Sequence, residues 1–354
     1  MSGRQTGATE LPTAAFDYDL PPDLIARFPA ERRDESRLLV VDRAGGGLED
    51  RRFADVASLL APGDALVVND TRVFPARLRG RKPSGAPAEI LLLRPCGPEV
   101  GDLWEALVRP GGKLKPGRTV IVGEGLEVVI EDSAPGGGRI VRLRGDEDPW
   151  SLVQRHGEVP LPPYLGREAE PTDRDRYQTV YARHTGSVAA PTAGLHFTPA
   201  LLDRIRASGV SVVPITLHIG IGTFRPVDAP TPSEHTLHQE HYQVSEDAVR
   251  TLNSVREDGG AVWAVGTTAA RTLETIVDTQ GHFAAGTGWT NLFIYPPFEF
   301  RAVDRLLTNF HLPRSSLLML VAAFAGHGPT MSAYEHAARE RYRFYSYGDS
   351  MAVL

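Results

Sequence analysis

The stretch between residues 76 and 145 limits the possible folds more than any other part of this chain. It holds five short apolar runs, separated by Gly and Pro turns at close spacing: AEILLLRP, LWEALVRP, TVIVG, LEVVIED and RIVRLRG. Such spacing, with no helical period between the runs, is typical of a small antiparallel sandwich or barrel. The sequence therefore predicts an all-β unit inside the chain.

Both flanks of this stretch alternate strand and helix patterns. Short apolar runs predict strands over residues 65–70, 210–220, 261–266 and 290–296. Helical periodicity predicts helices over residues 199–209, 245–260, 267–281, 314–326 and 331–344, with Ser245 as an N-cap. Such alternation is typical of an α/β layer with parallel strands.

The predicted fold class is therefore α/β, an α/β layer domain with an inserted small antiparallel β-barrel domain. We expect residues 16–75 and 146–354 to form the α/β domain, residues 76–145 to form the barrel, and residues 1–15 to be a disordered leader. A length of 354 residues fits two domains.

Composition excludes several classes of protein. Cys96 is the only cysteine, so neither an intrachain disulfide nor a thiolate metal cluster can form. No apolar run has the length of a membrane span, and the N-terminus lacks the pattern of a signal peptide. A net charge of −6 argues against indiscriminate nucleic-acid binding, although a local basic patch remains compatible with it. We expect a cytoplasmic protein without membrane contact.

The segment GSVAAPTAGLHFT, residues 186–198, combines thirteen mostly small residues with a histidine near its end. A core segment would carry bulkier side chains, and a flexible linker would not contain LHF. The pattern therefore fits neither of these alternatives, which makes His196 a candidate functional residue.

Two further candidate sites lie where predicted strands end, the usual place for ligands in open α/β sheets. In LHIGIGTFRPV, residues 217–227, a strand runs through His218 into Gly220, Gly222 and Thr223. Glycines there allow close approach of the backbone to a ligand. An ordinary Gly-rich turn is the alternative.

The second strand end is AVGTTAARTLET, residues 264–275. A helix that starts near Thr267 or Thr268 offers free N–H groups to an anion, and Arg271 lies one turn further on. The alternative is a capped helix with a solvated arginine.

Five of the eleven histidines fall between residues 196 and 241: His196, His218, His235, His238 and His241. The motif HTLHQEH offers potential metal ligands with Glu240, but its spacing is not that of HExxH. We therefore favour acid–base or hydrogen-bonding roles over a zinc site. Any single histidine can instead be a surface or core residue.

The stretch NDTRVFPARLRGRK, residues 69–82, is basic. It contains Arg72, Arg77, Arg79, Arg81 and Lys82. Such a cluster can bind a nucleic-acid backbone or can form a solvated strand face.

Nine segments, in order from Phe16 to Met351, resemble the S-adenosylmethionine:tRNA ribosyltransferase-isomerase family of queuosine biosynthesis. They are FDYDLPPDLIARFPAERRDESRLLV, LVVNDTRVFPARL, GSVAAPTAGLHFT, ITLHIGIGTFRPV, HTLHQEHYQV, AVGTTAARTLET, TNLFIYPPFEF, LLTNFHLPRSSLLMLVAAFAG and YRFYSYGDSM. The resemblance implies an α/β domain with an inserted β-barrel.

The resemblance also implies a reaction. S-adenosylmethionine would be a co-substrate that donates its ribosyl group, with no metal required. The acceptor would be 7-aminomethyl-7-deazaguanine at the wobble position of tRNAs with a GUN anticodon, which accept Tyr, His, Asp or Asn. The product would be epoxyqueuosine in tRNA, with adenine and methionine released. We expect a monomer.

On the motifs that carry this resemblance, we assign candidate roles in three groups. The acid–base or orienting candidates are His196, His218 and Glu240. In the reaction that the resemblance implies, the small residues of segment 186–198 would let the main chain approach a flat base or the ribose, with His196 facing the reacting centre. His196→Ala would then lose turnover with little loss of stability. The donor-binding candidates are Gly220, Gly222, Thr223, Thr267, Thr268 and Arg271, with Arg271 on the methionine carboxylate. The candidates for tRNA or base binding are Asn69, Asp70, Arg72, Arg77 and Arg314, although the first two can simply cap a turn.

The chain departs from the family pattern at two places. Pro297 and Phe298 stand where Gly-Tyr is usual, and Leu237 and Gln239 stand where a methionine and a serine are common. Two other functions remain open: a metal-dependent hydrolase that uses the histidines, and a tRNA-binding protein without catalytic activity.

Overall fold

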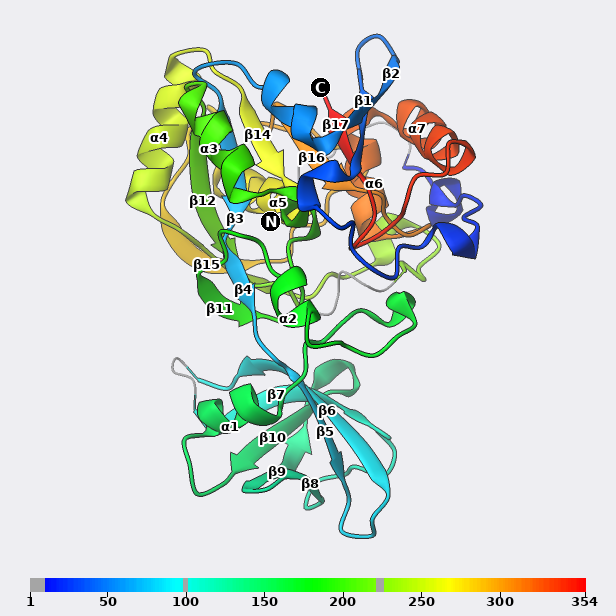
Figure 1. The fold of residues 1–354 in the computed structure, drawn as a ribbon, viewed down its shortest axis with the longest axis vertical. Helices are drawn as coiled ribbons and strands as arrows, with labels where there is room; N and C mark the ends of the chain where they lie inside the picture. The colour runs from blue at the N-terminus through cyan, green and yellow to red at the C-terminus, as the bar shows by residue number, and fades with distance from the viewer. Residues whose placement is uncertain (1–9, 98–100, 221–225) are drawn as a thin grey trace.

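The computed structural model describes residues 10–97, 101–220 and 226–354. Its strands form two main assemblies, a nine-stranded sheet and a closed six-stranded barrel. Figure 1 shows them at opposite ends of the long axis, with the barrel in the lower half. The expected fold class, an α/β layer with an inserted antiparallel barrel, is confirmed.

The large sheet is mixed, with four adjacent parallel strands at its centre. Its spatial order is β15-β13-β12-β3-β14-β16-β17-β1-β2, in which β12, β3, β14 and β16 run parallel. The strands are β1 Arg37–Val41, β2 Leu48–Arg52, β3 Ala65–Asn69, β12 Ser211–Leu217, β13 Glu240–Val244, β14 Val262–Val265, β15 Gly286–Thr290, β16 Arg305–Asn309 and β17 Ser350–Val353. The carboxyl ends of the four parallel strands therefore meet at one edge.

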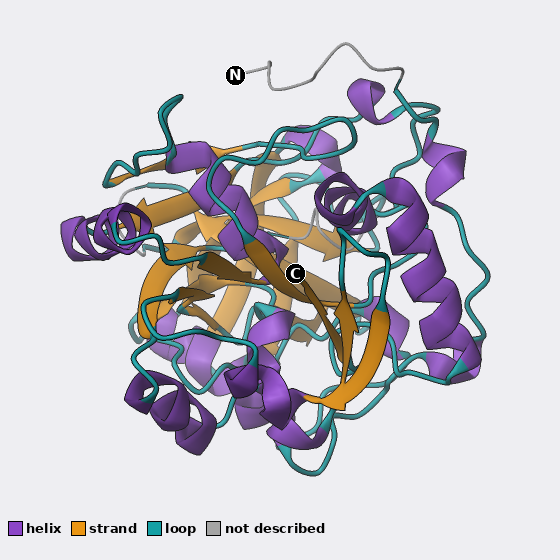
Figure 2. Cartoon of the chain, turned by 90° about the horizontal axis from the view of Figure 1, so that it is seen from above, coloured by secondary structure: helices purple, strands orange, loops and turns teal. Residues whose placement is uncertain are grey.

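Helices cover both faces of this sheet. One face packs on α4 Glu246–Glu257, α5 Gly266–Ile276, α6 Ser316–Ala325 and α7 His327–Arg339. The other packs on α3 Pro199–Ala207 and the 3₁₀ helix η4 Phe53–Ser58. Seen from above, helices lie around the periphery and strands in the interior (Figure 2). The parallel strands are accordingly buried on both sides, which explains their nearly continuous apolar sequences.

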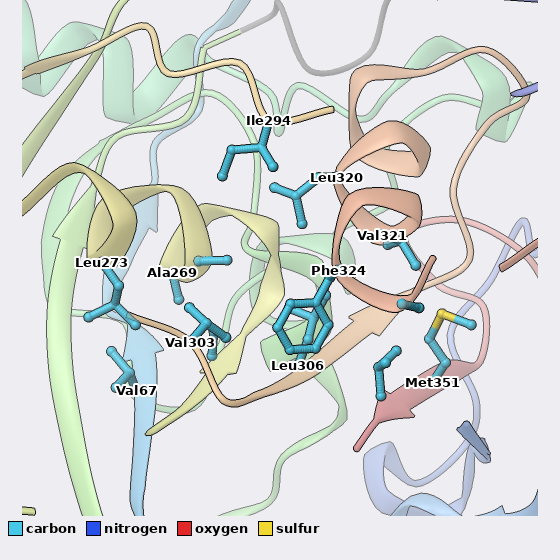
Figure 3. Packing of buried hydrophobic residues seen from close by; sticks show 14 of the residues in the cluster. Val67, Ala269, Leu273, Ile294, Val303, Leu306, Leu320, Val321, Phe324 and Met351 are labelled. Atoms are coloured by element: carbon cyan, nitrogen blue, oxygen red, sulfur yellow. The ribbon is translucent and has the colours of Figure 1, made fainter. Parts of the chain in front are cut away.

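Side chains of alternating direction build the first of these two layers. Figure 3 shows Val67 and Leu306 of the sheet facing Leu273 of α5 and Phe324 of α6. Side-chain caps start the helices where the sequence indicates them, and Ser245 accepts a bond from the Ala248 N–H as predicted.

The barrel has its own apolar core. Its strands are β5 Arg77–Arg81, β6 Pro87–Pro95, β7 Leu103–Arg109, β8 Thr119–Gly123, β9 Leu126–Ser133 and β10 Arg139–Arg144, each antiparallel to its neighbours. Alternate residues of each strand point inward, as in β6, where Ile90 and Leu92 are fully buried. These strands lie within the 76–145 range; the division of the chain into domains stays a prediction.

Between the sheet and the barrel the chain passes through short elements: the strands β4 Thr71–Val73 and β11 His184–Ser187, the helices α1 Pro149–His156 and α2 Asp173–Arg176, and the 3₁₀ helices η6 Pro163–Leu165 and η7 Thr192–His196. The other 3₁₀ helices are η1 Thr13–Phe16, η2 Pro22–Leu24 and η3 Arg33–Glu35 before β1, η5 Pro135–Gly137 between β9 and β10, and η9 Pro232–Glu234 between β12 and β13. Strands β4 and β11 pair in parallel directly below the end of β3 (Figure 1).

Two local predictions need correction. Of the strand predicted over residues 290–296, only Thr290 belongs to a strand, since β15 covers residues 286–290. Beyond it the Leu292 carbonyl accepts a bond from Arg271, and the Ile294 side chain is buried in the core. The disorder predicted for residues 1–15 is wrong for residues 13–15, because η1 begins at Thr13, which is buried and whose N–H bonds to the Pro230 carbonyl. Residues 1–9 lie outside the described residues.

None of the helices in the described part of the chain combines the length and apolar character that crossing a bilayer requires.

Candidate active site

A cavity with an empty volume of about 650 Å³ lies beyond the carboxyl ends of β14 and β16. We call it the central cavity. Its described lining is contributed by residues 189–193, 266–268, 308–312 and 345–346, with Tyr164, Ile219, Ser315 and Leu317. The edge of an α/β sheet where parallel strands end is the usual ligand site of such folds.

Helix α5 begins at this cavity. Gly266 has a φ of 86°, which favours glycine, and it turns the chain from β14 directly into the helix. The N-cap, Val265, makes no side-chain capping bond. Thr267 and Thr268, two of the predicted donor-binding residues, are buried here. The Thr268 hydroxyl has no partner among the described residues. The helix start therefore offers N–H groups and one unpartnered hydroxyl to a ligand.

Asn309, at the end of β16, presents an acceptor to the same cavity. Its amide nitrogen bonds the carbonyls of Tyr345 and Asp349, each at 3.3 Å, and lies 3.2 Å from His196 Nε2. Its Oδ1 is buried and has no partner within the described chain. The amide nitrogen can only donate, so its two protons are shared among the two carbonyls and His196 Nε2, which accepts. The proton of His196 is thus on Nδ1, which bonds Ser36 Oγ at 2.7 Å, while the Ser36 hydroxyl donates to the Arg33 carbonyl.

His196 lies behind Asn309 and does not line the central cavity. Its side chain is buried, and the ring stacks on Phe53 with centroids 4.9 Å apart. Burial, reinforced by the nearby charges of Arg33 and Arg343, lowers its pKa to about 3. The imidazole is therefore neutral at ordinary pH, and both ring nitrogens are already bonded. The structure does not bring it to the cavity as the sequence predicted.

A second cavity, the ion-pair cavity, shares Leu317 with the central cavity and has an empty volume of about 360 Å³. Both Glu240 and Arg271 line it and form a buried ion pair. Arg271 Nε also bonds the Leu292 carbonyl at 2.8 Å, whereas its Nη2 has no partner among the described residues. One face of the guanidinium therefore remains available to a ligand.

Glu240 is bonded on both oxygens. Oε2 accepts from Arg271, and Oε1 accepts from the Gly220 N–H at 3.0 Å. This carboxylate fixes two predicted donor-binding residues in place, which supports an orienting role. The other two predicted residues of that loop, Gly222 and Thr223, lie outside the described residues.

Asn69 and Asp70 lie where β3 leaves the sheet. Asn69 bonds both the N–H and the carbonyl of Leu217, at 3.0 and 2.9 Å. Asp70 accepts a bond from the Thr216 hydroxyl at 2.7 Å, and burial raises its pKa. Both residues join β3 to β12, so their described contacts match the turn-capping alternative rather than exposure to a base.

His218 lies beside this junction. Its Nδ1 is 2.8 Å from the Thr71 hydroxyl, and its ring stacks on His241 with centroids 6.0 Å apart. Burial, with the charges of His241 and His184, lowers its pKa to about 4. Ile219 lines the central cavity, but His218 does not.

The small residues of segment 186–198 have two distinct reasons to be small. Ala189, Ala190 and Ala193 line the central cavity, as expected for main chain close to a ligand. The two glycines instead accommodate neighbouring rings. A Cβ on Gly186 would lie 2.7 Å from the His218 ring, and one on Gly194 would lie 2.1 Å from the Tyr181 hydroxyl.

The arginines predicted for tRNA differ in availability. Arg72 is exposed on β4. Arg77 is partly buried and bonds the Leu161 carbonyl at 3.1 Å, with Glu89 at 3.7 Å, so it braces the barrel. Arg314 is half-exposed beside Ser315 at the cavity wall and pairs with Asp17 at 3.4 Å.

The histidines of HTLHQEH do not converge. His235 packs against Phe293, whereas His241 packs against Trp289. Within residues 10–97, 101–220 and 226–354, no group of three His, Cys, Asp or Glu side chains is arranged to hold a metal ion.

Among the cavity residues that the sequence interpretation missed are Asn309, His311, Tyr164 and Tyr345. His311 lines the central cavity, its Nε2 is 2.8 Å from the Thr308 hydroxyl, and burial lowers its pKa to about 3. The rule that ligands lie beyond strand ends, applied to the LLTNFH segment, would have identified Asn309 and His311. No local signal marks the tyrosines.

The two departures from the family pattern lie differently. Phe298 packs against Phe300 beside the core, and neither Pro297 nor Phe298 is among the described lining of the two cavities. Leu237 lines the ion-pair cavity, and Gln239 is exposed.

Comparisons with known proteins agree over nearly the whole chain. Residues 13–353 match the sequence model of a family described as queuosine biosynthesis protein. A protein of Syntrophomonas wolfei named S-adenosylmethionine:tRNA ribosyltransferase-isomerase is 54% identical over 346 residues, 96% of this chain and 97% of that one. A protein of the same name from Moorella thermoacetica is 53% identical, over 96% and 98%.

The chain is also similar to solved structures. The crystal structure of an S-adenosylmethionine tRNA ribosyltransferase from Thermotoga maritima matches with 41% identity and a TM-score of 0.56, over 96% of this chain and 100% of that one.

Proposed function

The chain belongs to the S-adenosylmethionine:tRNA ribosyltransferase-isomerases, transferase enzymes of queuosine biosynthesis, and from this we propose its reaction. It transfers and isomerises the ribosyl group of S-adenosylmethionine onto 7-aminomethyl-7-deazaguanine at the wobble position of a GUN-anticodon tRNA. The products are epoxyqueuosine-tRNA, adenine and methionine. The full-length similarity carries this proposal, and the central cavity at the carboxyl edge of the sheet supports it.

The donor binds across the two cavities, which adjoin at Leu317. When bound, its sulfonium acidifies the neighbouring C5′ hydrogens, so that a base can start the departure of adenine. The start of α5, with Thr267 and Thr268, supplies N–H and hydroxyl groups to its polar atoms, and Asn309 Oδ1 accepts a bond from an amino group.

Arg271 binds the methionine carboxylate through Nη2. Since its Nη1 and Nε are committed to Glu240 and the Leu292 carbonyl, we propose a contact through one nitrogen rather than a bidentate fork. Glu240 orients the guanidinium, and His196 orients the Asn309 amide. Both are positioning residues.

His311 is a candidate hydrogen-bonding group in the central cavity. Its low pKa keeps the imidazole neutral, and Thr308 holds the ring. A pKa of about 3 makes this imidazole a weak base at neutral pH, so we propose that it orients a polar group of the ligand rather than accepting a proton. His218 remains an acid–base or orienting candidate on the acceptor side.

We further propose that the protein works in the cytoplasm as a monomer and needs no metal. Arg72 and Arg314 face solvent and are candidates for the tRNA backbone. The central cavity lies in the α/β domain of residues 16–75 and 146–354, to which the barrel would be an accessory for RNA.

A turnover assay tests the reaction. The protein is incubated with S-adenosylmethionine and a GUN-anticodon tRNA that carries 7-aminomethyl-7-deazaguanine, and the digested RNA is analysed by mass spectrometry. We expect epoxyqueuosine together with equimolar adenine and methionine, and no loss of activity with a chelator. Tight tRNA binding without donor consumption would instead indicate a binding protein, and loss of activity with a chelator would indicate a metal enzyme.

A further inference from the structure

A third cavity lies beside the central cavity and shares Ser346 with it. Its enclosed space has room for about one water molecule, so an oxygen atom of an anion, rather than a whole ligand, fits between its walls. We call it the arginine cavity, because the side chains of Arg33 and Arg176 both line it, together with Pro29, Ser36 and His196. None of the residues that we assign to donor binding lines this cavity. The proposed reaction therefore leaves these two arginines without a role.

Both guanidiniums are held by backbone carbonyls alone. Arg33 bonds the carbonyls of Leu195 at 3.0 Å and Asp175 at 2.8 Å. Arg176 bonds the carbonyls of Glu31, at 3.1 Å, and Ala30, and its Nε is buried with no partner in the described chain. These bonds orient the two groups without neutralising either.

No carboxylate of the described residues lies within 4.0 Å of either guanidinium. The carboxylate whose charge acts on Arg33 is the exposed Asp175, which lies beyond ion-pair distance. The buried Asp173, on the same helix as Arg176, is fully committed: Arg167 bonds both of its oxygens, at 2.7 and 2.8 Å, and the Tyr347 hydroxyl and Glu170 N–H complete its bonds. Two partly buried cations that face one cavity without a counter-ion form an incomplete arrangement, and an anion would complete it.

The rim of the cavity indicates which anion. Phe28, next to Pro29, is 49% exposed, although large apolar side chains are usually buried. The Arg167 guanidinium lies 4.4 Å from its ring centroid, and Arg343 bonds its carbonyl. An exposed aromatic ring amid arginines is typical of sites that stack a base and bind the adjoining phosphate.

We propose that the arginine cavity binds a phosphodiester of the tRNA substrate through Arg33 and Arg176, while Phe28 stacks on an adjacent base. The shared Ser346 wall puts this phosphate next to the central cavity, so the contact would hold the RNA backbone beside the nucleotide that is modified. This proposal rests on the proposed function, because it assumes a tRNA substrate.

Charge-removing variants with a matched control test the proposal. Arg33→Met and Arg176→Met are compared with Arg256→Met, which removes a partly buried arginine that also bonds two backbone carbonyls, of Gly281 and Arg301, far from the cavities. The dissociation constant for GUN-anticodon tRNA is measured by anisotropy between 50 and about 300 mM KCl, with KM for tRNA and for S-adenosylmethionine.

We expect each cavity variant to bind tRNA about tenfold more weakly and to flatten the logarithmic salt dependence by roughly 0.7–0.9, the value of one phosphate contact. The Arg→Lys variants keep the wild-type slope, Arg256→Met binds like wild type, and KM for S-adenosylmethionine stays unchanged. Phe28→Ala, a surface change that leaves the fold intact, weakens binding severalfold with an unchanged slope.

Wild-type affinity and slope in the two Met variants, or normal binding by Phe28→Ala, overturns the proposal. A raised KM for S-adenosylmethionine with unchanged tRNA binding overturns it too, because the anion would then be the donor carboxylate. Failure of the proposed function has a different signature: the wild-type protein itself neither binds the tRNA nor forms product.

Discussion

At the scale of single residues, the structure changes the meaning of the most conspicuous histidine. The sequence places His196 at the end of a segment of small residues, which suggests a catalytic imidazole. The fold buries the ring and commits both of its nitrogens, so its effect on a ligand passes through Asn309.

His196→Ala therefore costs stability as well as turnover, contrary to the expectation from the sequence. The change leaves a cavity against Phe53 and unpairs Ser36 and Asn309, for which we expect a loss of about 2–4 kcal/mol. Urea unfolding measures it. Asn309→Ala is the companion variant, and it should lose turnover because it removes the cavity acceptor; a His196→Ala protein as stable as wild type would contradict the assignment.

Two buried imidazoles make the protein sensitive to acid. Burial lowers the pKa of both His196 and His311 from 6.5 to about 3, so below pH 6.5 the unfolded chain binds protons that the folded chain does not. The free energy of unfolding is therefore unaffected by the two rings above pH 6.5, and it decreases as the pH falls from 6.5 toward 3. At pH 5 we expect a loss of about 2 kcal/mol for each ring.

The measurement is the free energy of unfolding in urea at intervals between pH 7 and pH 5. His311→Gln serves as the comparison, because a neutral amide removes one of the two titrating groups. Its curve should be shallower by one proton; parallel curves for both proteins would show that the imidazole is not responsible.

Gly194 is a glycine because a Cβ at this position would clash with neighbouring side chains, not because its backbone requires a positive φ. An added Cβ would lie 2.1 Å from the Tyr181 hydroxyl and 2.8 Å from Thr179 Cγ2. We expect Gly194→Ala to lose about 1–3 kcal/mol of stability. Gly328→Ala is the control, because its Cβ meets nothing within 4 Å on helix α7 and should raise stability by up to ~1 kcal/mol. Equal midpoints of thermal unfolding for the two variants would contradict this account.

At the scale of elements, one buried ion pair joins strand β13 to helix α5. Glu240 and Arg271 are 4% exposed each, and their side chains also bond the backbone of Gly220 and of Leu292. The sequence shows both residues but not their pairing, because they belong to segments that only the sheet brings together.

Breaking this pair should be more costly than removing it. Glu240→Ala leaves the Arg271 charge buried without its counter-ion, for which we expect a loss of about 3–5 kcal/mol. The double variant Glu240→Ala with Arg271→Ala should lose less than the sum of the single variants, by roughly 1–3 kcal/mol. A double-mutant cycle by urea unfolding measures this difference, and strict additivity would mean that the pair does not interact.

The elements also show where local pattern is sufficient. Helices α3, α4 and α6 begin at Thr198, Ser245 and Ser315, each of which caps the helix with its hydroxyl. Segment 290–296 has the composition of a strand but bonds to Arg271 rather than to a neighbouring strand. Its conformation depends on a side chain about twenty residues away, which a local pattern does not contain.

At the scale of the whole molecule, the sheet and the barrel each have an apolar core of their own. The barrel also differs in charge: residues 77–144 carry twelve Lys and Arg against eight Asp and Glu, whereas the chain as a whole has a net charge of −6. The proposed division into domains therefore coincides with a division between two apolar cores and with a difference in charge.

Separate cores predict separate responses to cavities. Ile90 of the barrel and Leu306 of the sheet are both fully buried, and truncation of either to alanine should cost about 2–5 kcal/mol. In hydrogen exchange, Ile90→Ala should speed exchange in strands β5–β10 and leave β3 and β14 unchanged, while Leu306→Ala should do the reverse. Uniform acceleration across the chain in both variants would indicate one cooperative unit.

The sequence by itself determined the fold class, the position of the barrel and the family, because each depends on periodicity and motifs within short stretches. The tertiary structure alone decided which candidates meet. Asn309, His311 and the start of α5 line one cavity, whereas His196 does not line it. Arg33 and Arg176 line the arginine cavity beside the first. The physical reason is that burial and unpartnered polar groups arise from contacts between distant segments.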